Sequence, residues 1–529
     1  MASFDALRIL RAVLAAAALA GLAHAQSQDA RGNILGRVTD PSGAVIPLAE
    51  VKARNTATGV TVGAKTNESG SYVLPFLIPG VYEVTTEAPG FRRFVRGNIQ
   101  VRVNENVQLD IQLTVGDLAE VVQVTSEPPL LQTAEATLGQ VVDERRILEL
   151  PLFAGNAMDL VHLAPGTVNG TDMRLRKAPF NNAPSQFSTD GSGNYGNAFT
   201  IDGVANLYSD GTSPRVAFSP PQAALAEFKV QTSSFDASVG RTAGALVNVS
   251  TKGGTNELHG MMWYWLRHSK LDAPTIYQNR SNPPGYKLPI YQDHRYGISG
   301  GAPVIIPGLY SGKNRTFWHF TYEANKFGDP NVGGSMISTV PSQAWREGDL
   351  SDLLKLGANY QLYDPLSIAA APGGRFSRQP LPGNIYPKSR IHPVAQKILA
   401  LYPLPNQPGT ADGRNNYFMS KPALEDYWTT IGRIDHAFNE RNRMFVRFHR
   451  DFWEEDKNRT FGDSVNGIIL NRINRGIALD DVHMLSSTMV VNLRYGISAQ
   501  EFPERRVSQG FDLSSLGFSP NLVNLIDKQ

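Results

Sequence analysis

Few residues of this 529-residue chain are arranged for covalent chemistry. The chain has no cysteine, and none of its 10 histidines stands in an HxxE or HExxH pattern, so thiolate nucleophiles and the usual zinc-peptidase ligands are excluded. The stretch Gly191–Gly196 matches the nucleotide-binding pattern GxGxxG, but no apolar strand precedes it and no amphipathic helix follows. We therefore predict that these glycines form turns, that the protein is not an enzyme, and that it holds no metal and no cofactor.

The composition narrows the possible partners. Charged residues make up 19% of the chain and the formal net charge is +2, with no run of like charges, so nothing favours nucleic-acid binding. No apolar stretch of about 18 residues follows residue 25, so no membrane-spanning helix is predicted for the mature chain. Transmembrane β-strands would escape that search, because their apolar residues occur only at every second position.

Residues 1–25 have the pattern of a signal peptide. Arg8 and Arg11 form a basic region, residues 13–22 form a short apolar core, and residues 23–25 fit a small-x-small cleavage site. The alternative is an uncleaved anchor, but the apolar core is short for a bilayer. We expect the protein to be exported through a cleaved signal peptide.

Residues 32–113 alternate short apolar strands with turn residues, which predicts a small β-sandwich. The expected strands are residues 34–38, 50–54, 60–64, 72–74, 82–86 and 107–113. The runs GRVTDPSGAVIPLAEVKARNTATG and TNESGSYVLPFLIPGVYEVTTEAPGF resemble the carboxypeptidase regulatory-like domain, which implies a prealbumin-like, carbohydrate-binding-like sandwich without catalytic residues. Its aromatic residues could stack on a sugar or form the core; they are Tyr72, Phe76, Tyr82, Phe91 and Phe94.

Residues 133–255 carry three motifs in order: LPLFAGNAMDLVHLAPG, FTIDGVAN, and a longer run that ends in GALVNVSTKGGTNELHG. They resemble the plug of Oar-like and SusC-like TonB-dependent receptors. The family usually has Leu-Asn-Gly-Arg where this chain has Leu152 to Asn156. The missing arginine puts in doubt any plug-to-barrel ion pair that it would make.

In the same receptors, a short acidic and valine-rich segment before the plug is the TonB box. The resemblance implies this role for residues 116–125, GDLAEVVQVT. Such a segment would add as a strand to the edge of a periplasmic partner's sheet, with backbone hydrogen bonds carrying the pull. The residues predicted to make the contact are Leu118, Glu120, Val121, Val122, Val124 and Thr125. The alternative is a last strand or linker of the preceding sandwich.

Residues 256–529 show strands with apolar and polar side chains in alternation. In residues 315–324, 443–450 and 489–499, one face is apolar and the other carries most of the polar side chains. This pattern is typical of a transmembrane barrel around water or a polar plug, although a two-sheet sandwich would alternate too. The runs NRTFWHFTYEANK and WTTIGRIDHAFNERNRMFVRFHRD resemble the first part of the Oar-like barrel. The Pro-rich residues 350–406 would be a long extracellular loop with a helix at 394–401.

The expected fold is mainly β: a prealbumin-like sandwich, a plug domain, and an incomplete transmembrane antiparallel β-barrel. Plugged transporters have about 22 strands, whereas the residues after the plug hold roughly seven to ten, so we expect an open sheet from a fragment or truncated chain.

We expect an outer-membrane TonB-dependent receptor with three partners: a TonB-type protein, outer-membrane lipid, and an unidentified extracellular ligand such as a carbohydrate or peptide. The alternative is a secreted or surface carbohydrate-binding or adhesion protein.

Overall fold

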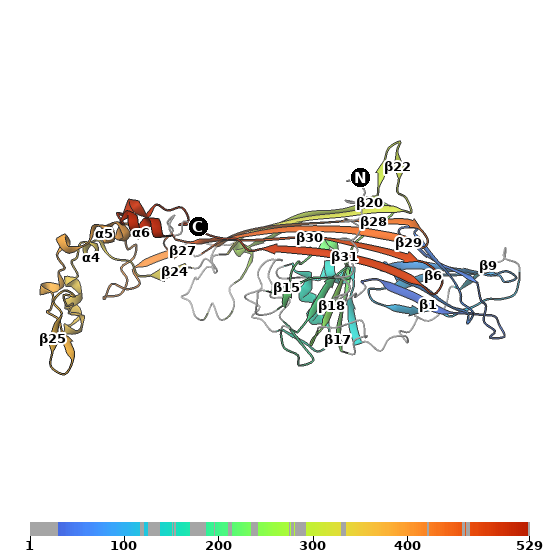
Figure 1. The fold of residues 1–529 in the computed structure, drawn as a ribbon, viewed down its shortest axis with the longest axis horizontal. Helices are drawn as coiled ribbons and strands as arrows, with labels where there is room; N and C mark the ends of the chain where they lie inside the picture. The colour runs from blue at the N-terminus through green and yellow to red at the C-terminus, as the bar shows by residue number, and fades with distance from the viewer. Residues whose placement is uncertain are drawn as a thin grey trace, which may run out of the picture.

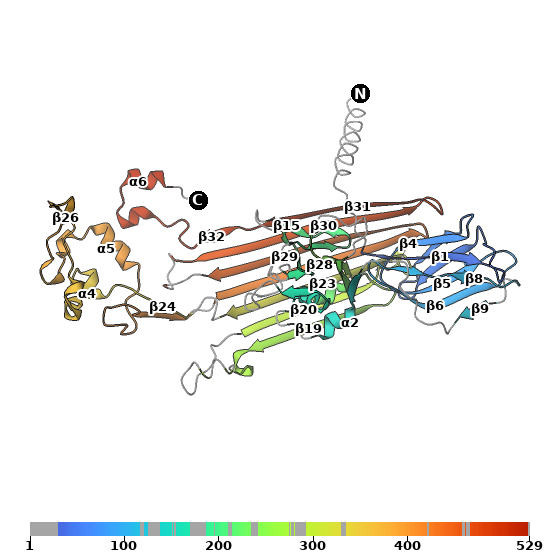
Figure 2. The ribbon, with the colours of Figure 1, turned by 90° about the horizontal axis from the view of Figure 1, so that it is seen from below.

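A computed structural model describes residues 30–116, 121–124, 138–150, 152, 155–169, 187–194, 196–209, 214–233, 242–273, 276, 280, 292–329, 335–420, 423–457, 461 and 466–526. Over these residues the protein is mainly β, as predicted. It contains an N-terminal sandwich, a small central sheet that we call the plug sheet, and a large curved sheet that we call the wall (Figure 1). The sandwich lies at one end of the wall and the plug sheet lies against its concave face (Figures 1 and 2). The predicted signal peptide lies outside the described residues.

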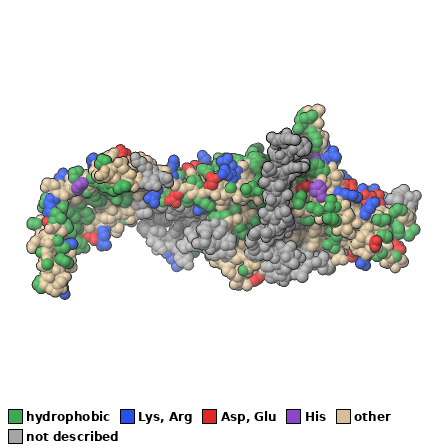
Figure 3. Space-filling model, in the orientation of Figure 1, with side chains coloured by type: hydrophobic (Ala, Val, Ile, Leu, Met, Phe, Trp, Pro, Cys, Tyr) green, Lys and Arg blue, Asp and Glu red, His purple; other side chains and the backbone are tan. Residues whose placement is uncertain are grey.

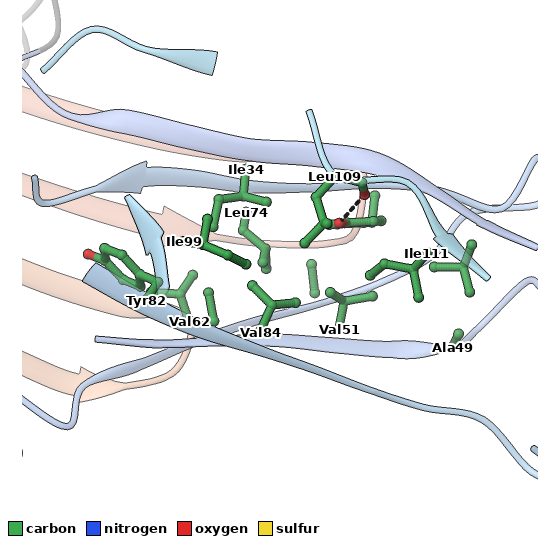
Figure 4. Close-up of a cluster of buried hydrophobic side chains, with 14 of the residues drawn as sticks. Ile34, Ala49, Val51, Val62, Leu74, Tyr82, Val84, Ile99, Leu109 and Ile111 are labelled. Carbon is green, nitrogen blue, oxygen red and sulfur yellow. Dashed lines mark hydrogen bonds between the residues drawn. The ribbon is translucent and has the colours of Figure 1, made fainter. Parts of the chain in front are cut away.

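The sandwich consists of two facing sheets. One has the order β4–β1–β7, with β8 also paired to β1, and the other has the order β3–β2–β5–β6–β9. The strands are β1 Gly32–Thr39, β2 Glu50–Asn55, β3 Thr61–Lys65, β4 Ser71–Leu77, β5 Gly80–Glu87, β6 Arg93–Val101, β7 Asn106–Gln108, β8 Ile111–Gln112 and β9 Val121–Val124. Alternate side chains such as Ile34, Leu74 and Val84 fill the space between the sheets (Figure 4).

The predicted strands of the sandwich are found, with two differences. Strand β6 was not predicted, because a register shift opposite Tyr82–Val84 and a positive φ of 57° at Asn98 interrupt its alternation. The predicted strand 107–113 divides into β7 and β8. The aromatic side chains of Tyr72, Tyr82 and Phe94 are buried, so they belong to the core and form no exposed platform for a sugar.

The plug sheet has the order β10–β17–β18–β13–β14, and two small hairpins, β11–β12 and β15–β16, accompany it. Its elements are β10 Leu138–Val142, α2 Glu144–Glu149, η2 Ala157–Leu163, β11 Thr167–Asn169, β12 Phe187–Thr189, β13 Ala198–Ile201, β14 Val204–Ala205, β15 Leu207–Ser209, β16 Pro214–Val216, η5 Gln222–Ala224, β17 Leu225–Ser233 and β18 Leu246–Thr251. Its core is rich in phenylalanine and includes Phe187, Phe199 and Phe228. The GxGxxG stretch follows β12 as a turn, with Gly191 at φ 81°, and not as a strand-to-helix phosphate loop.

The wall is an eight-stranded antiparallel sheet in the order β19–β20–β23–β28–β29–β30–β31, with β32 also paired to β30. Its strands are β19 His259–His268, β20 Gln292–Pro303, β23 Thr316–Asp329, β28 Ala423–Asn439, β29 Asn442–Lys457, β30 Ile468–Met484, β31 Val490–Glu501 and β32 Glu504–Arg506. Over the described residues β19 and β31 are the two edges, so the wall is an open, curved sheet, in line with the expected incomplete barrel.

Side chains alternate across the wall as predicted. In β23, His319, Thr321 and Glu323 are buried on the concave side, whereas Phe320 on the opposite face is exposed. In β29, Arg447 is buried and Phe448 is exposed. The plug sheet covers the polar face, while no described sheet packs across the apolar face (Figures 1 and 2). This arrangement fits a barrel wall and contradicts the two-sheet sandwich.

A long connection extends beyond one end of the wall. Beyond β23, residues 335–420 extend far from the sheet (Figure 1). They contain β24 Ser335–Ser338, α4 Gln343–Arg346, η7 Ser351–Leu356, η8 Ala358–Tyr360, β25 Ala369–Ala371, β26 Arg375–Ser377, η9 Pro382–Asn384, η10 Lys388–Arg390, α5 Pro393–Ala400 and β27 Tyr417–Ser420. Helix α5 confirms the helix predicted at 394–401.

The remaining elements are η6 Ser269–Leu271, β21 Ile305–Ile306, β22 Tyr310–Ser311, η11 Leu513–Leu516 and α6 Pro520–Leu525. No helix among the described residues has both the length and the apolar character to cross a bilayer.

Candidate functional site

The plug sheet meets the wall through buried charges, and Asp202 lies at the centre of the largest group. Asp202 and Gly203 form the two-residue turn between β13 and β14, with positive φ values of 50° and 78°. Asp-Gly suits this hairpin turn because both residues tolerate positive φ. The Asp202 carboxylate accepts hydrogen bonds from the backbone N–H of Thr251 at 2.9 Å and from its hydroxyl at 2.8 Å. Two of the motifs noted in the sequence, FTIDGVAN and the run that ends in NELHG, therefore meet at this carboxylate.

The wall supplies the positive charges opposite Asp202. Arg433 of β28 donates to Asp202 Oδ1 at 3.0 Å and to Asp435 Oδ1 at 2.7 Å, and Arg447 Nε of β29 lies 3.2 Å from Asp202 Oδ2. All of these charged groups are buried. A buried ion pair is destabilised strongly when one partner is removed, because the other charge remains without compensation. The cluster thus fixes the plug sheet to the wall.

A second group of charges joins all three parts of the protein. Asp480 of β30 accepts from Arg31, at the start of the sandwich, at 2.7 Å and from Arg494 of β31 at 2.6 Å. Arg494 also donates to the backbone carbonyl of Gly203 in the plug turn at 3.4 Å. The sandwich, the wall and the plug turn therefore meet at one group of buried polar contacts.

The position of the missing family arginine is used differently here. Asn156 accepts from the backbone N–H of Met158 at 3.0 Å and so caps η2. The neighbouring Gly155 carbonyl accepts from Arg295 of β20, whose guanidinium also pairs with Glu323 at 2.8 Å. Asn156 makes no ion pair in place of the missing arginine, and the plug is joined to the wall by other pairs, those of Asp202 with Arg433 and Arg447.

Strand β17 of the plug sheet binds a loop of the sandwich through three alternate side chains. Glu227 accepts from the backbone N–H of Val103, Lys229 donates to the Asn104 carbonyl at 2.6 Å, and Gln231 accepts from the Asn104 side chain at 3.3 Å. Burial raises the pKa of the Glu227 carboxyl to about 7, against the hydrogen bond from Val103, which lowers it. We therefore expect the contact between sandwich and plug to weaken as the pH rises from 4.5 to about 7.

The predicted partner-binding segment lies partly outside the described residues. Val121–Val124 form β9, which pairs in parallel with Arg93 to Arg96 at the edge of the sandwich. Leu118, Glu120 and Thr125 are not described. The pairing corresponds to the alternative weighed on the sequence, a last strand of the sandwich.

The far end of the wall is the candidate region for ligand contacts. Strands of 17 residues such as β30 reach about 55 Å at roughly 3.3 Å per residue, so they extend beyond a hydrocarbon core of about 30 Å. The distal segment 335–420 is ordered by buried amides, since Asn384 binds Tyr360 and Leu362 while Asn416 binds Val340. Exposed side chains there include Tyr363 and Phe376. No cluster of metal-binding side chains occurs among the residues that the structure describes.

The sequence analysis missed Asp202, Arg433, Asp435, Arg447 and Asp480 as partners. Their signal was present, because four of them are charged residues on the inward face of alternating strands and the fifth occupies a hairpin turn. The alternation of apolar and polar residues shows on which face of a strand a side chain lies. It does not show which residue that side chain contacts.

Comparisons with known proteins agree with this geometry. Residues 250–528 match the family described as outer membrane beta barrel domain, and residues 33–114 match the carboxypeptidase regulatory-like domain. The chain is 29% identical over 276 residues to the TonB-dependent transporter Oar of Myxococcus xanthus, a match that covers 48% of this chain and 24% of that protein.

Two solved structures show lower similarity. The outer membrane transporter YddB of Escherichia coli has a TM-score of 0.44 and 13% identity, covering 70% of this chain and 39% of its own. The siderophore receptor PirA of Acinetobacter baumannii has a TM-score of 0.34 and 12% identity, covering 70% and 44%. The chain thus spans about a quarter of the curated relative that it matches and less than half of these structures.

Proposed function

This chain belongs to the outer membrane beta barrel domain family, and from that premise we propose that it acts in a TonB-dependent receptor that imports an extracellular ligand across the outer membrane. One observation carries the proposal: the wall turns apolar side chains outward and buries charged ones against a sheet on its concave side. A receptor of this kind makes and breaks no covalent bond, so we propose that the chain is not an enzyme.

The proposal assigns a part to each segment. Residues 1–25 direct export and are removed, residues 32–113 form a periplasmic sandwich, and residues 133–255 form the plug. Residues 256–529 form the wall within the outer membrane. The sandwich lies at the end of the wall opposite the distal segment, which supports a periplasmic sandwich and an extracellular ligand (Figure 1).

Residues 116–125 would transmit the energy. An extended strand that adds to a partner's sheet can bear force along its backbone hydrogen bonds. The chain continues from this segment to β10, which is an edge strand of the plug sheet and pairs only with β17 among the described strands. Force applied to the segment would therefore peel β10 away first, while the Asp202 cluster on the opposite side of the sheet still holds.

Cell fractionation and uptake test this function. The protein is expected in the outer membrane, and uptake is expected to stop when residues 118–125 are replaced by a Gly-Ser linker of equal length. A matched control replaces the exposed turn 40–43 of the sandwich and should retain uptake. Recovery of the protein in the soluble periplasm would contradict the proposal.

The competing function is carbohydrate binding by the sandwich. Phe76 and Phe91 are both only partly buried, but the Phe76 ring already packs against the Arg31 guanidinium, so Phe91 is the better candidate for stacking on a sugar. Glycan-array binding by the full chain that is lost in Phe91→Ala would favour this alternative.

A further inference from the structure

A short hairpin at the sandwich end of the wall has an apolar surface that no described part of the chain covers. It consists of β21 and β22 and connects β20 to β23. Ile305, Ile306 and Leu309 are 54%, 47% and 80% exposed, and Pro307 between them is exposed too. Contiguous exposed apolar side chains usually mark a contact surface.

The hairpin has a defined turn and a firmly held base. Pro307 and Gly308 occupy its turn, with Gly308 at φ 73° and the Leu309 N–H donating to the Ile306 carbonyl at 3.0 Å, as in a type II turn. At the base, the Gly312 N–H donates to the Val304 carbonyl at 2.7 Å. The Tyr310 hydroxyl bonds to Thr316 of β23, which bonds in turn to His436 at 2.6 Å. These hydrogen bonds hold the base of the hairpin to the wall, and the apolar tip projects from this base.

The direction in which the hairpin points indicates which surface it contacts. It rises from the face of the wall opposite the plug sheet (Figure 1), and hydrophobic side chains gather on this projection (Figure 3). That face is the apolar, outward side of the wall. Trp318 follows the base at Thr316 by two residues, about 7 Å along the strand, and lies on the same outward face as Phe320. The hairpin therefore continues the outward face at its periplasmic end.

The polar residues of the hairpin agree with a lipid surface. Residues 304–316 contain no Asp or Glu, whereas Lys313 and Arg315 are exposed beside the base. Tyrosine is enriched at membrane interfaces, and long basic side chains can reach lipid phosphates while their stems stay in apolar surroundings. A protein partner would have to approach along the face of the wall that the lipid occupies.

We propose that residues 305–310 insert into the periplasmic leaflet of the outer membrane and anchor this end of the wall next to the docked sandwich. The inference depends on insertion of the wall into the membrane, as in the proposed function. The tip enters the boundary between lipid headgroups and acyl chains, and Lys313 and Arg315 face the phosphates. The hairpin would resist the inward pull on the plug by holding the rim against the bilayer.

Because the chain has no native cysteine, single labels can test this insertion. The variants Leu309→Cys, Ile477→Cys and Glu440→Cys, each carrying an environment-sensitive fluorophore, are reconstituted as the full chain in vesicles that contain nitroxide lipids. Ile477 is an outward residue within β30, and Glu440 lies in another turn at the same end of the wall. The label at 309 should be quenched more by shallow than by deep nitroxides, in line with burial of about 5–10 Å. The label at 477 should favour the deep ones and the label at 440 should respond to neither.

The outcomes separate the two proposals. If the label at 477 is not quenched, the wall is not in lipid and the proposed function fails. If 477 is quenched but 309 behaves like 440, the hairpin is in water and the anchor is refuted. A blue-shifted label at 309 without lipid quenching would indicate a protein contact or a second copy, which also overturns the anchor.

Discussion

Glu227 offers the sharpest test of how the sandwich is held to the plug. Its carboxyl is buried beneath the sandwich loop and accepts the backbone N–H of Val103. When the sandwich leaves, this carboxyl becomes exposed to water and its pKa should return to the ordinary value of 4.5. In the docked state burial raises the pKa to about 7.

The two pKa values set the sign and size of the effect. Below pH 4.5 the carboxyl is neutral in both states, so docking is strongest. Between pH 4.5 and about 7 the undocked carboxyl ionises first, so docking weakens as the pH rises, and above about 7 it reaches a plateau. Each pH unit between the pKa values is worth about 1.4 kcal/mol, which gives a total loss of about 3 kcal/mol. The equilibrium constant for docking should thus fall by between two and three powers of ten, and Glu227→Gln should remove this pH dependence.

Hydrogen exchange of the Val103 amide measures this equilibrium, because that N–H is released when the loop leaves β17. Opening free energies, corrected for the intrinsic exchange rate, are compared from pH 5 to 8 in the parent and in Glu227→Gln. Glu105→Gln is the control: it removes a carboxyl of the same loop that accepts from the Arg102 backbone N–H and that adds only secondarily to the raised pKa of Glu227, so most of the pH dependence should remain. A parent without pH dependence, or a Glu227→Gln variant that keeps it, would refute the reasoning.

Three further predictions concern buried contacts. Asp202→Asn removes the negative charge that compensates two guanidinium groups of the wall, so it should weaken docking of the plug by about 3–5 kcal/mol. Hydrogen exchange of the Thr251 amide measures this loss. Unchanged protection of that amide would contradict the role of the cluster. Gly155→Ala should destabilise more than Gly191→Ala in thermal unfolding. Both glycines have positive φ, which costs alanine about 1–2 kcal/mol, but a Cβ at 155 would lie 0.9 Å from a guanidinium nitrogen of the wall, whereas 191 is open. Tyr72→Phe should cost about 1–3 kcal/mol in denaturant unfolding, because its hydroxyl donates to a buried carbonyl at 2.6 Å; equal stability would show that this bond contributes nothing.

Much of the fold could be predicted because its signals are local. The strands of the sandwich alternate over a few residues, and so do those of the wall. Strand β6 escaped prediction because the irregularity around Asn98 shifts its phase. Residues 121–124 illustrate another limit, since an extended valine-rich segment suits either the edge of its own sandwich or that of a partner.

The sequence by itself determined the order of the parts and which face of β23, β29 and β31 is apolar, because alternation is a property of neighbouring residues. Only the tertiary structure decided which charges meet. Arg433 and Asp202 lie 231 positions apart and Arg31 and Asp480 lie 449 apart, so no local pattern could pair them. Their partners were chosen by strand register and by the seating of the plug sheet, because a buried charge requires a specific neighbour and not merely a polar face.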